Sequence, residues 1–439
     1  MKISWGILGP ETLSNERRTR TLGLGASVRA FNDLAVPGLG NVWFGKQLFL
    51  ATLGVALAER TRGAGKNIQN IETANAIEAI ACWWALKSNG WKPDARLRGA
   101  TKMQGKNDIS FAAVRKRDFY VSQPMRMATV QPLPALGIVN TDGNRFNAFT
   151  SSQYGHDLIE AQFAGYSPDS HKGSFEALAN WTMDKTAFSR KNMDVQEALS
   201  PLVPMSIRAG EILRERLIQG SNQENMADKE RRRAALAWVE SLRDKPNQKL
   251  TWENKPIHID DAHWQDLIAG ALFFSVRDAA IRLLDRLEAH IGNQKNQRFS
   301  LDDPIPDSVK PDIQTLRNLA KDFLDKQHKD ELANSFCREC VNENDTVLLI
   351  SLIGRDERVL RIRDRVVLPG PAFRGSTIPE DVTDQFPEGE VTETNITDAI
   401  EWPDGISTRI RNLFLLNLDL HGKLSDWLGG TPNPEGGVQ

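Results

Sequence analysis

Residues 108–163 read DISFAAVRKRDFYVSQPMRMATVQPLPALGIVNTDGNRFNAFTSSQYGHDLIEAQF, and this stretch determines the fold predicted for the first third of the chain. Asp108 is an N-cap candidate, because its carboxylate accepts hydrogen bonds from the free amides of a first helical turn. It predicts a short helix over 109–117, and residues 118–121 then supply a turn. The stretch therefore opens as a helix followed by a turn.

A second helix is predicted over 123–133. Ser122 is an N-cap candidate, and Pro124 falls in the first turn, where the missing N–H of proline costs nothing. Pro132 and Pro134 lie near the end of this helix, and each removes an amide donor and clashes with the preceding turn. We therefore expect a short or kinked second helix.

A β-hairpin is predicted after the second helix. Two short runs at 138–140 and 145–149 flank Asp142 and Gly143, and Asp-Gly between such runs is a strong hairpin signal. Residues 150–163 then have the pattern of a third helix. The full order is helix, turn, helix, hairpin, helix.

Part of this stretch, LGIVNTDGNRFNAFTSSQYG at 136–155, resembles the wing of bacterial winged-helix regulators. In those proteins a Leu-Gly-Ile/Val segment leads into a hairpin and then into a helix start. The resemblance implies a winged helix-turn-helix element over about 71–163, with a helix at 71–86 as its first helix. It departs from the pattern at Pro132 and Pro134, where a recognition helix would continue. Winged helices also bind proteins, so the fold alone does not establish DNA binding.

Seven side chains of this element are predicted to contact nucleic acid. Gln123 and Arg126 lie at the start of the second helix, where helix-turn-helix proteins address the major groove. Arginine bonds guanine bidentately, and glutamine does the same to adenine. The other candidates end the first helix or lie in the hairpin: Arg115, Lys116, Arg117, Asn144 and Arg145.

The net charge of −2 over 439 residues conceals a gradient. Residues 1–150 contain 20 Lys and Arg against 10 Asp and Glu, residues 151–300 contain 20 against 21, and residues 301–439 contain 15 against 26. A basic third is the electrostatic footprint of a phosphate-binding surface. The acidic third contacts a basic partner, folds back on the basic third, or keeps the protein soluble, and the sequence leaves these alternatives open.

The predicted fold class is mainly α and multidomain, because helical periodicity dominates outside the hairpin. The strongest further helical patterns cover 46–59, 207–218, 229–243, 261–290 and 408–428. TVLLISLIG and VLRIRDRVVL, which begin at Thr346 and Val359, favour strands, with helix as the alternative, and make the acidic end a small α+β region. The predicted domains are a basic one at 1–166, a helical one at 175–292, an acidic one at 313–429 and a disordered tail at 430–439.

Cysteine content and hydropathy predict a cytoplasmic protein. The chain has three cysteines, Cys82, Cys337 and Cys340, which exclude a disulfide framework and suit a reducing compartment. The longest apolar run, 48–58, is too short to span a bilayer. The N-terminus lacks a signal-peptide pattern. We therefore expect no contact with a membrane.

Motifs for catalysis are incomplete. His258, Asp260 and His263 cluster in HIDDAHW and are the candidates for a metal site, because imidazole and carboxylate donate lone pairs to metals. The alternative is that an aspartate caps the helix that follows. The basic run at 230–233 favours a solvated helix face. No cofactor is predicted.

The sequence favours a non-enzymatic nucleic-acid-binding subunit, with DNA as the expected ligand. A larger bacterial DNA-processing or genome-defence assembly is the predicted setting, with protein partners on the helical middle and the acidic end. Two alternatives stay open: a metal-dependent nuclease, and a scaffold that uses the winged fold to bind protein.

Overall fold

The computed structural model describes residues 20–116, 118–143, 145–166, 171–186, 193–375 and 400–428. The chain is mainly helical with a few short strands, which confirms the predicted class. It divides into two compact units. The described part of unit 1 is 20–30 with 269–375, and that of unit 2 lies within 31–268 and 400–428.

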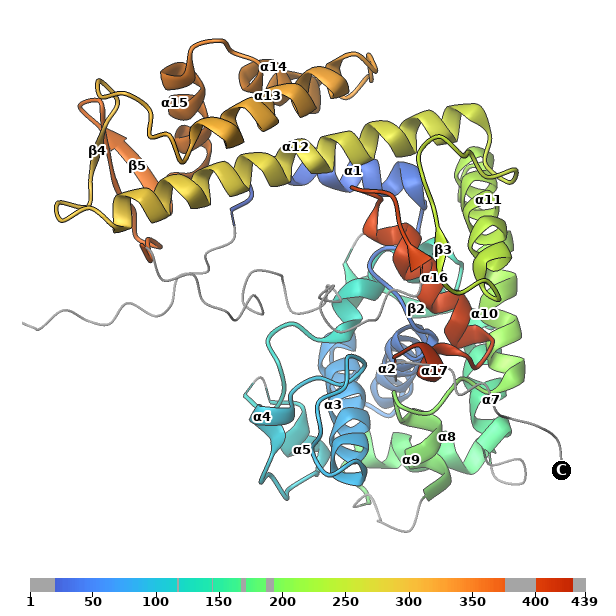
Figure 1. Cartoon of the computed structure of the whole chain (residues 1–439). Coiled ribbons are helices and arrows are strands. Elements are labelled where there is room, and N and C mark those ends of the chain that lie inside the picture. The colour runs from blue at the N-terminus through green and yellow to red at the C-terminus, as the bar shows by residue number, and fades with distance from the viewer. Residues whose placement is uncertain are drawn as a thin grey trace, which may run out of the picture. The chain divides into compact units, whose positions relative to one another are not determined.

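Unit 2 contains most of the elements (Figure 1). Its helices are α2 (Gly45–Gly63), α3 (Asn70–Ser88), α4 (Ala100–Met103), α5 (Phe111–Val114), α6 (Pro132–Ala135), α7 (Gln153–Tyr166), α8 (His171–Thr182), α9 (Met193–Leu199), α10 (Ile207–Gln219), α11 (Met226–Leu242), α16 (Thr408–Leu420), α17 (Leu424–Leu428) and the 3-10 turns η1 (Met125–Thr129) and η2 (Phe146–Ala148). Its strands are β1 (Val139–Asn140), β2 (Thr150–Ser151), β3 (Gln248–Lys249) and β7 (Ile400–Glu401), paired as β1–β2 and β3–β7.

Unit 1 contains three helices and a small sheet. They are α13 (Lys310–Leu324), α14 (Glu331–Cys340), α15 (Asp345–Asp356), β4 (Phe299–Ser300), β5 (Leu360–Arg363) and β6 (Val366–Pro369). The antiparallel sheet has the order β4-β6-β5. Two helices contribute residues to both units: α1 (Gly25–Ala35) and α12 (Asp261–Gly292).

The core of unit 2 forms around α2 and α3, which lie side by side (Figure 1). From Gly45 to Ala58 every residue of α2 is buried, as is typical of a helix that is apolar on all sides. The two helices approach closely at Gly54, which has no side chain where Ala74 of α3 packs against it. Packing therefore holds α2, whose three glycines lower its intrinsic helix propensity.

The last helices join this same core. Leu413 of α16 is fully buried, and α16 contacts α2, α10 and α11. One continuous apolar cluster includes the first helices of unit 2, its middle helices and residues 400–424. Unit 2 thus combines segments far apart in the sequence, unlike the contiguous ranges 1–166, 175–292 and 313–429 predicted above.

The structure differs from the prediction over 108–135. α5 is a single turn, and its N-cap is Ser110, whose Oγ accepts from the Ala113 amide at 3.4 Å. The second predicted helix is split into η1 and α6. Pro132 and Pro134 occupy the first turn of α6, where backbone amides need no intrahelical acceptor. These prolines therefore start a new helix.

The predicted hairpin has a shorter ladder than expected. β1 pairs antiparallel with β2 through Val139↔Ser151 and Asn140↔Thr150. Residues 145–149 do not form the second strand, and η2 lies there instead. Phe146 and Phe149 are both buried, with ring centroids 5.3 Å apart. A 3-10 turn places residues three apart on one side, which directs both rings into the core.

Long periodic segments were predicted well. The helices expected at 46–59, 71–86, 207–218, 229–243 and 261–290 correspond to α2, α3, α10, α11 and α12. The strand prediction for 346–354 was wrong, because this segment is α15, capped by the Asn344 side chain. VLRIRDRVVL does form a hairpin, β5–β6.

Arg20 anchors the N-terminal segment of unit 1. Its guanidinium lies 2.5 Å from an Asp285 oxygen and 3.0 Å from a Glu288 oxygen, both on α12. Its Nε lies 3.5 Å from Asp356 at the end of α15. Arg20, Glu288 and Asp356 are buried, so this cluster ties α15 to α12 inside unit 1.

Candidate nucleic-acid interface

Most of the predicted basic charge is concentrated in residues 87–117, which we call the basic segment. It contains nine Lys and Arg against Asp94 and Asp108. The segment begins in the last turn of α3 and includes α4 and α5, both of which contact α3 (Figure 1). A segment with this excess of positive charge is an electrostatic candidate for binding phosphates.

Three lysines of the basic segment face solvent without a hydrogen bond or ion pair to the described residues, and Lys116 interacts only at longer range with Asp108. Lys92, Lys102 and Lys116 are exposed, and no hydrogen bond or ion pair of their side chains is formed with the described residues. A long exposed ammonium retains its rotamer freedom and its hydration until a ligand anion approaches. These lysines are therefore the side chains of the segment that are available to phosphate.

Other cations of the segment hold the structure together. Lys106 donates to the carbonyls of Asp118 and Phe119 at 2.9 and 3.2 Å. Arg96 lies 2.9 Å from Asp94 and donates to Ser425 Oγ at 3.0 Å. These contacts fold the segment back on itself and on α17, so Lys106 and Arg96 are structural.

Two predicted site residues lie near the start of α3. The Arg115 guanidinium is 3.0 Å from a Glu72 carboxylate oxygen, and both side chains are partly exposed. Arg145 is exposed and directly precedes η2, which contacts α3. Asn147 Oδ1 accepts the Ile71 amide at 3.0 Å. The fold thus brings Arg115 and Arg145, 30 residues apart, to one end of α3.

A buried carboxylate positions the predicted recognition segment. Glu78 of α3 accepts from the Tyr120 hydroxyl at 2.8 Å and from the amides of Met125 and Arg126 at 2.6 and 3.0 Å. Burial raises the pKa of Glu78, and these three hydrogen bonds oppose that rise. Glu78 therefore supplies the acceptor that the first amides of η1 need.

Of the two predicted base-reading residues, Gln123 is buried and Arg126 is partly exposed. Gln123 is only 7% exposed. Arg126 donates through Nε to Asn75 Oδ1, and its guanidinium lies 5.5 Å from the centroid of the Phe146 ring. Burial lowers the pKa of Arg126, opposed by the charge of Glu78. Gln123 is thus buried, and the Arg126 side chain is engaged by Asn75 and Phe146.

Two further predicted site residues, Arg117 and Asn144, lie outside the described residues. The same holds for the predicted tail at 430–439 and for 376–399, where seven of the acidic residues fall. Residues 269–375 contain 17 basic and 17 acidic residues. The acidity predicted for 301–439 thus comes mainly from its last part, and its partner stays a prediction.

The metal candidates do not converge. His263 is fully buried, its Nε2 is 3.0 Å from the Ala35 carbonyl oxygen, and burial lowers its pKa. Asp260 caps α12 by accepting the His263 amide at 2.8 Å, while His258 is exposed. Within the described ranges no group of three or more His, Cys, Asp or Glu side chains is placed to hold a metal ion.

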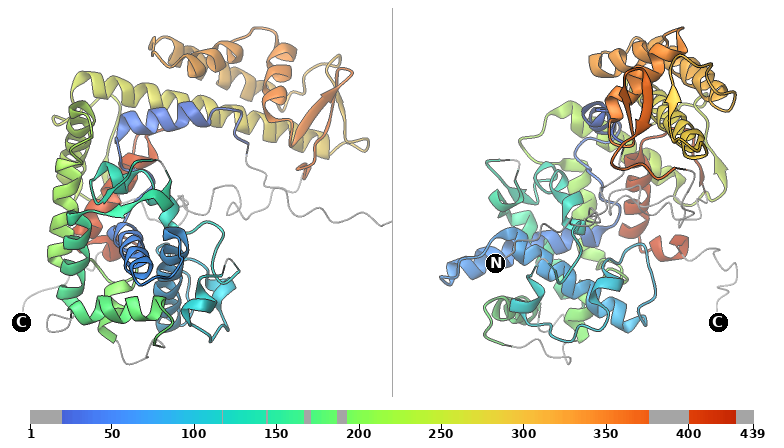
Figure 2. Two further views of the ribbon diagram at one scale, coloured as in Figure 1. Left: turned by 180° about the vertical axis from the view of Figure 1, so that it is seen from behind. Right: turned by 90° about the vertical axis from the view of Figure 1, so that its left-hand side faces the viewer.

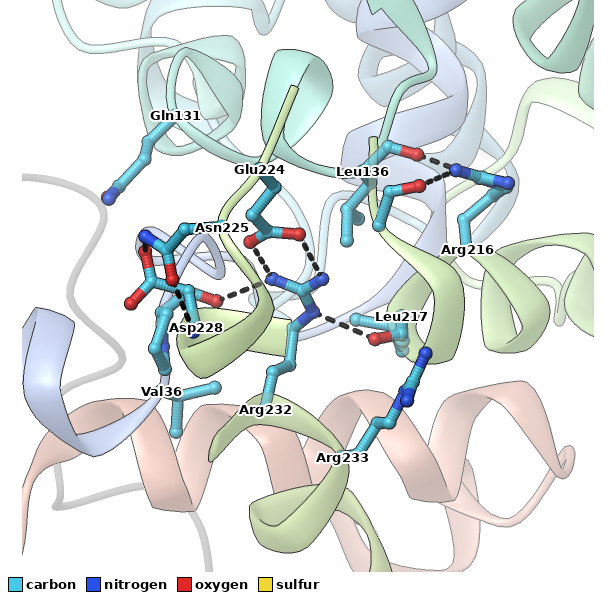
Figure 3. Close-up of polar contacts among 12 residues, drawn as sticks. Val36, Gln131, Leu136, Arg216, Leu217, Glu224, Asn225, Asp228, Arg232 and Arg233 are labelled. Atoms are coloured by element: carbon cyan, nitrogen blue, oxygen red, sulfur yellow. Dashed lines mark hydrogen bonds and ion pairs between the residues drawn. The ribbon is translucent and has the colours of Figure 1, made fainter. Parts of the chain in front are cut away.

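The basic run at 230–233 was predicted as a solvated face, and this was wrong for Arg232. Its side chain is fully buried and forms two bonds to the Glu224 carboxylate (Figure 3). It also donates to the carbonyls of Leu217 and Pro37 at 2.8 and 3.1 Å. Arg233 donates to the Ile218 carbonyl at 2.7 Å. This run holds α11 to its neighbours.

Lys46 is a buried amine that no sequence motif singled out. It is 1% exposed, and its Nζ donates to the Ala198 carbonyl at 2.7 Å and lies 5.4 Å from the Tyr166 ring centroid. Burial lowers its pKa from 10.5 to about 7, opposed by the charge of Asp419. Asp419 itself accepts the Gly45 amide at 2.7 Å. Because the sequence around Lys46 is mostly apolar, it did not indicate a buried charge here.

Substitution of Lys46 by methionine is expected to remove a pH dependence of stability. Between pH 7 and 10.5 the unfolded lysine binds more protons than the folded one, so the free energy of unfolding rises with pH. The slope is at most about 1.4 kcal/mol per pH unit. Chemical denaturation at pH 7, 8 and 9 should show a steeper rise in the wild type than in K46M. Parallel profiles would contradict the burial of a titrating amine.

No family model, curated protein or solved structure matches the chain. Among the described residues, no helix is long and apolar enough to cross a membrane.

Proposed function

We propose that this protein binds nucleic acid, with duplex DNA as its ligand, through the phosphate backbone. The observation that carries the proposal is the basic segment 87–117, whose exposed Lys92, Lys102 and Lys116 form no hydrogen bond or ion pair with the described residues, although the charge of Lys116 acts on Asp108. Phosphate contacts by lysine supply most of the sequence-independent affinity for DNA. A role as subunit of a DNA-processing assembly is part of this proposal.

Arg115 adds an exchangeable contact. Its pair with Glu72 is partly exposed on both sides, and such pairs contribute only about 0–1 kcal/mol. A phosphate can therefore replace the Glu72 carboxylate at little cost. Gln123 is buried and Arg126 is bonded to Asn75, so base readout by these two residues is not part of the proposal. We expect binding with little sequence preference.

The expected result is a reduced salt dependence after removal of the three lysines. Affinity for a random-sequence duplex is measured by fluorescence anisotropy over about 50–200 mM salt. For K92A/K102A/K116A the slope of log affinity against log salt should fall by up to about 2.7, because each phosphate contact contributes about 0.9.

A matched control removes three exposed lysines elsewhere. K185A/K245A/K321A changes the net charge equally, and all three positions are exposed. Equal affinities and slopes for both triple variants and the wild type would contradict the proposal. Absence of wild-type binding even at low salt would favour the protein-binding scaffold instead.

A further inference from the structure

Unit 1 contains a helix-turn-helix followed by a β-hairpin. α13, α14 and α15 succeed one another, with the four residues 341–344 between α14 and α15. β5 follows α15 directly, pairs with β6, and β6 also pairs with β4 (Figure 2). Helix-turn-helix motifs have a connecting turn of this length.

Polar contacts fix α15 against α14. Glu339 of α14 accepts from Ser351 Oγ at 2.5 Å and from the Arg355 guanidinium at 2.6 and 2.8 Å. Arg317 of α13 donates to the carbonyls of Asn342 and Glu343 at 2.8 and 2.9 Å. The turn is therefore clamped by α13, and the module has a defined geometry.

The hairpin presents arginines on its edge strand. In β5 Leu360 is fully buried, while Arg361 and Arg363 are exposed. Residues two apart in a strand point to the same side, so these two guanidinium groups share one side of the ribbon. Asp364 and Arg365 form the turn with φ of 50° and 60°.

The charge of the hairpin is weakly neutralised. Residues 358–365 contain four arginines and one aspartate, and Arg365 pairs with Asp302 at 2.7 Å. Arg363 lies 3.7 Å from Asp364, but the two side chains are 82% and 93% exposed. Arg361 has no ion-pair or hydrogen-bond partner among the described residues. Such exposed pairs contribute little, which leaves Arg361 and Arg363 available to an external anion.

The outward side of α15 cannot read base edges. Its exposed residues include Val347 and Ile350, at 45% and 37% exposure, and Gly354. None of these side chains forms hydrogen bonds, and Asp345 adds a negative charge at the start of the helix. The most exposed positions of α15 therefore offer no hydrogen-bonding side chain, and the arginines of the hairpin are the groups that fit phosphate.

We propose that residues 299–369 form a winged helix-turn-helix module whose β5–β6 hairpin binds the phosphates of duplex DNA through Arg361 and Arg363. This is a second contact, in unit 1, beyond the basic segment of unit 2. It deepens the proposed function but rests on different residues. The contact is sequence-independent, because it uses charge and no base edge.

The test is the double variant R361A/R363A in the full-length protein. Binding to a random-sequence duplex is measured as a function of salt, and the slope is expected to fall by about 1.8, which corresponds to two phosphate contacts. R361K/R363K should retain most of the affinity, because a phosphate contact needs a cation, whereas bidentate base readout needs arginine. The control R208A/R282A removes two exposed arginines elsewhere.

Two outcomes would overturn the inference. The first is an R361A/R363A protein that binds DNA with wild-type affinity and slope. If this variant also self-associates, the arginines serve only to protect an edge strand from pairing with another copy. The second is a lysine variant as weak as the alanine variant. Comparison of R361A/R363A with K92A/K102A/K116A separates the two sites. A loss of DNA affinity in only one of these two variants assigns binding to the unit that carries its substitutions.

Discussion

Glu224→Ala is expected to destabilise unit 2 by about 3–5 kcal/mol, because it leaves the buried Arg232 charge without its partner. Arg232 is fully buried, and the Glu224 side chain is 8% exposed. The remaining acceptors of Arg232 are neutral carbonyls of Leu217 and Pro37. Neutral acceptors do not compensate the desolvation of a guanidinium as a carboxylate does.

The double variant E224L/R232M provides the sharper comparison. Replacing both members of a buried ion pair by apolar side chains is often tolerated, whereas removal of one member is not. We therefore expect E224L/R232M to be more stable than E224A. A double variant as unstable as E224A would show that the carbonyl contacts of Arg232, and not the charge pair, stabilise this region.

Glu211→Ala is the surface control. Its partner is Arg208, and the two side chains are 58% and 68% exposed, so a change of less than about 1 kcal/mol is expected. Ten of the eleven tryptophans lie in unit 2, so the tryptophan fluorescence of denaturation experiments reports on this unit. Equal midpoints for E224A and E211A would contradict the prediction.

Periodicity predicted the long helices because their burial is continuous along the sequence. α3 and α10 each carry apolar side chains in a helical pattern and begin near a predicted boundary. The same reasoning failed at 346–354, where β-branched residues suggested a strand. There the Asn344 cap and the buried stripe of Leu348, Leu349 and Leu352 favour helix, so local packing overrides the β preference of single residues.

The site was harder to predict, because exposure depends on distant partners. Gln123 and Arg126 have polar side chains at a helix start, yet Glu78, more than 40 residues earlier, accepts the amides of Met125 and Arg126 and fixes this backbone to α3. Arg232 looks like its basic neighbours in the sequence and is distinguished only by Glu224. The charge of the basic segment was visible in the composition, but the availability of single lysines required the structure.

Gly54→Leu is expected to disrupt the packing of α2 on α3. A Cβ at residue 54 would lie 2.6 Å from the Cβ of Ala74 and 2.9 Å from its backbone nitrogen. Backbone atoms cannot turn aside as a flexible side chain does, so the helices must separate. Overpacking of a core costs about 1–3 kcal/mol and occasionally more, and we expect at least the upper end of this range. The gain in helix propensity on replacing glycine, about 1 kcal/mol, does not offset this cost.

Gly63→Leu, at the end of the same helix, is the matched control for Gly54→Leu. A Cβ at Gly63 meets no atom within 4 Å, so the same side chain is added without overlap. Its stability should stay within about 1 kcal/mol of the wild type, with any change in the stabilising direction. Tryptophan fluorescence during urea unfolding measures both variants. A Gly54→Leu protein as stable as Gly63→Leu would show that α2 and α3 do not touch at Gly54 and Ala74, and the core of unit 2 would then need a different helix pairing.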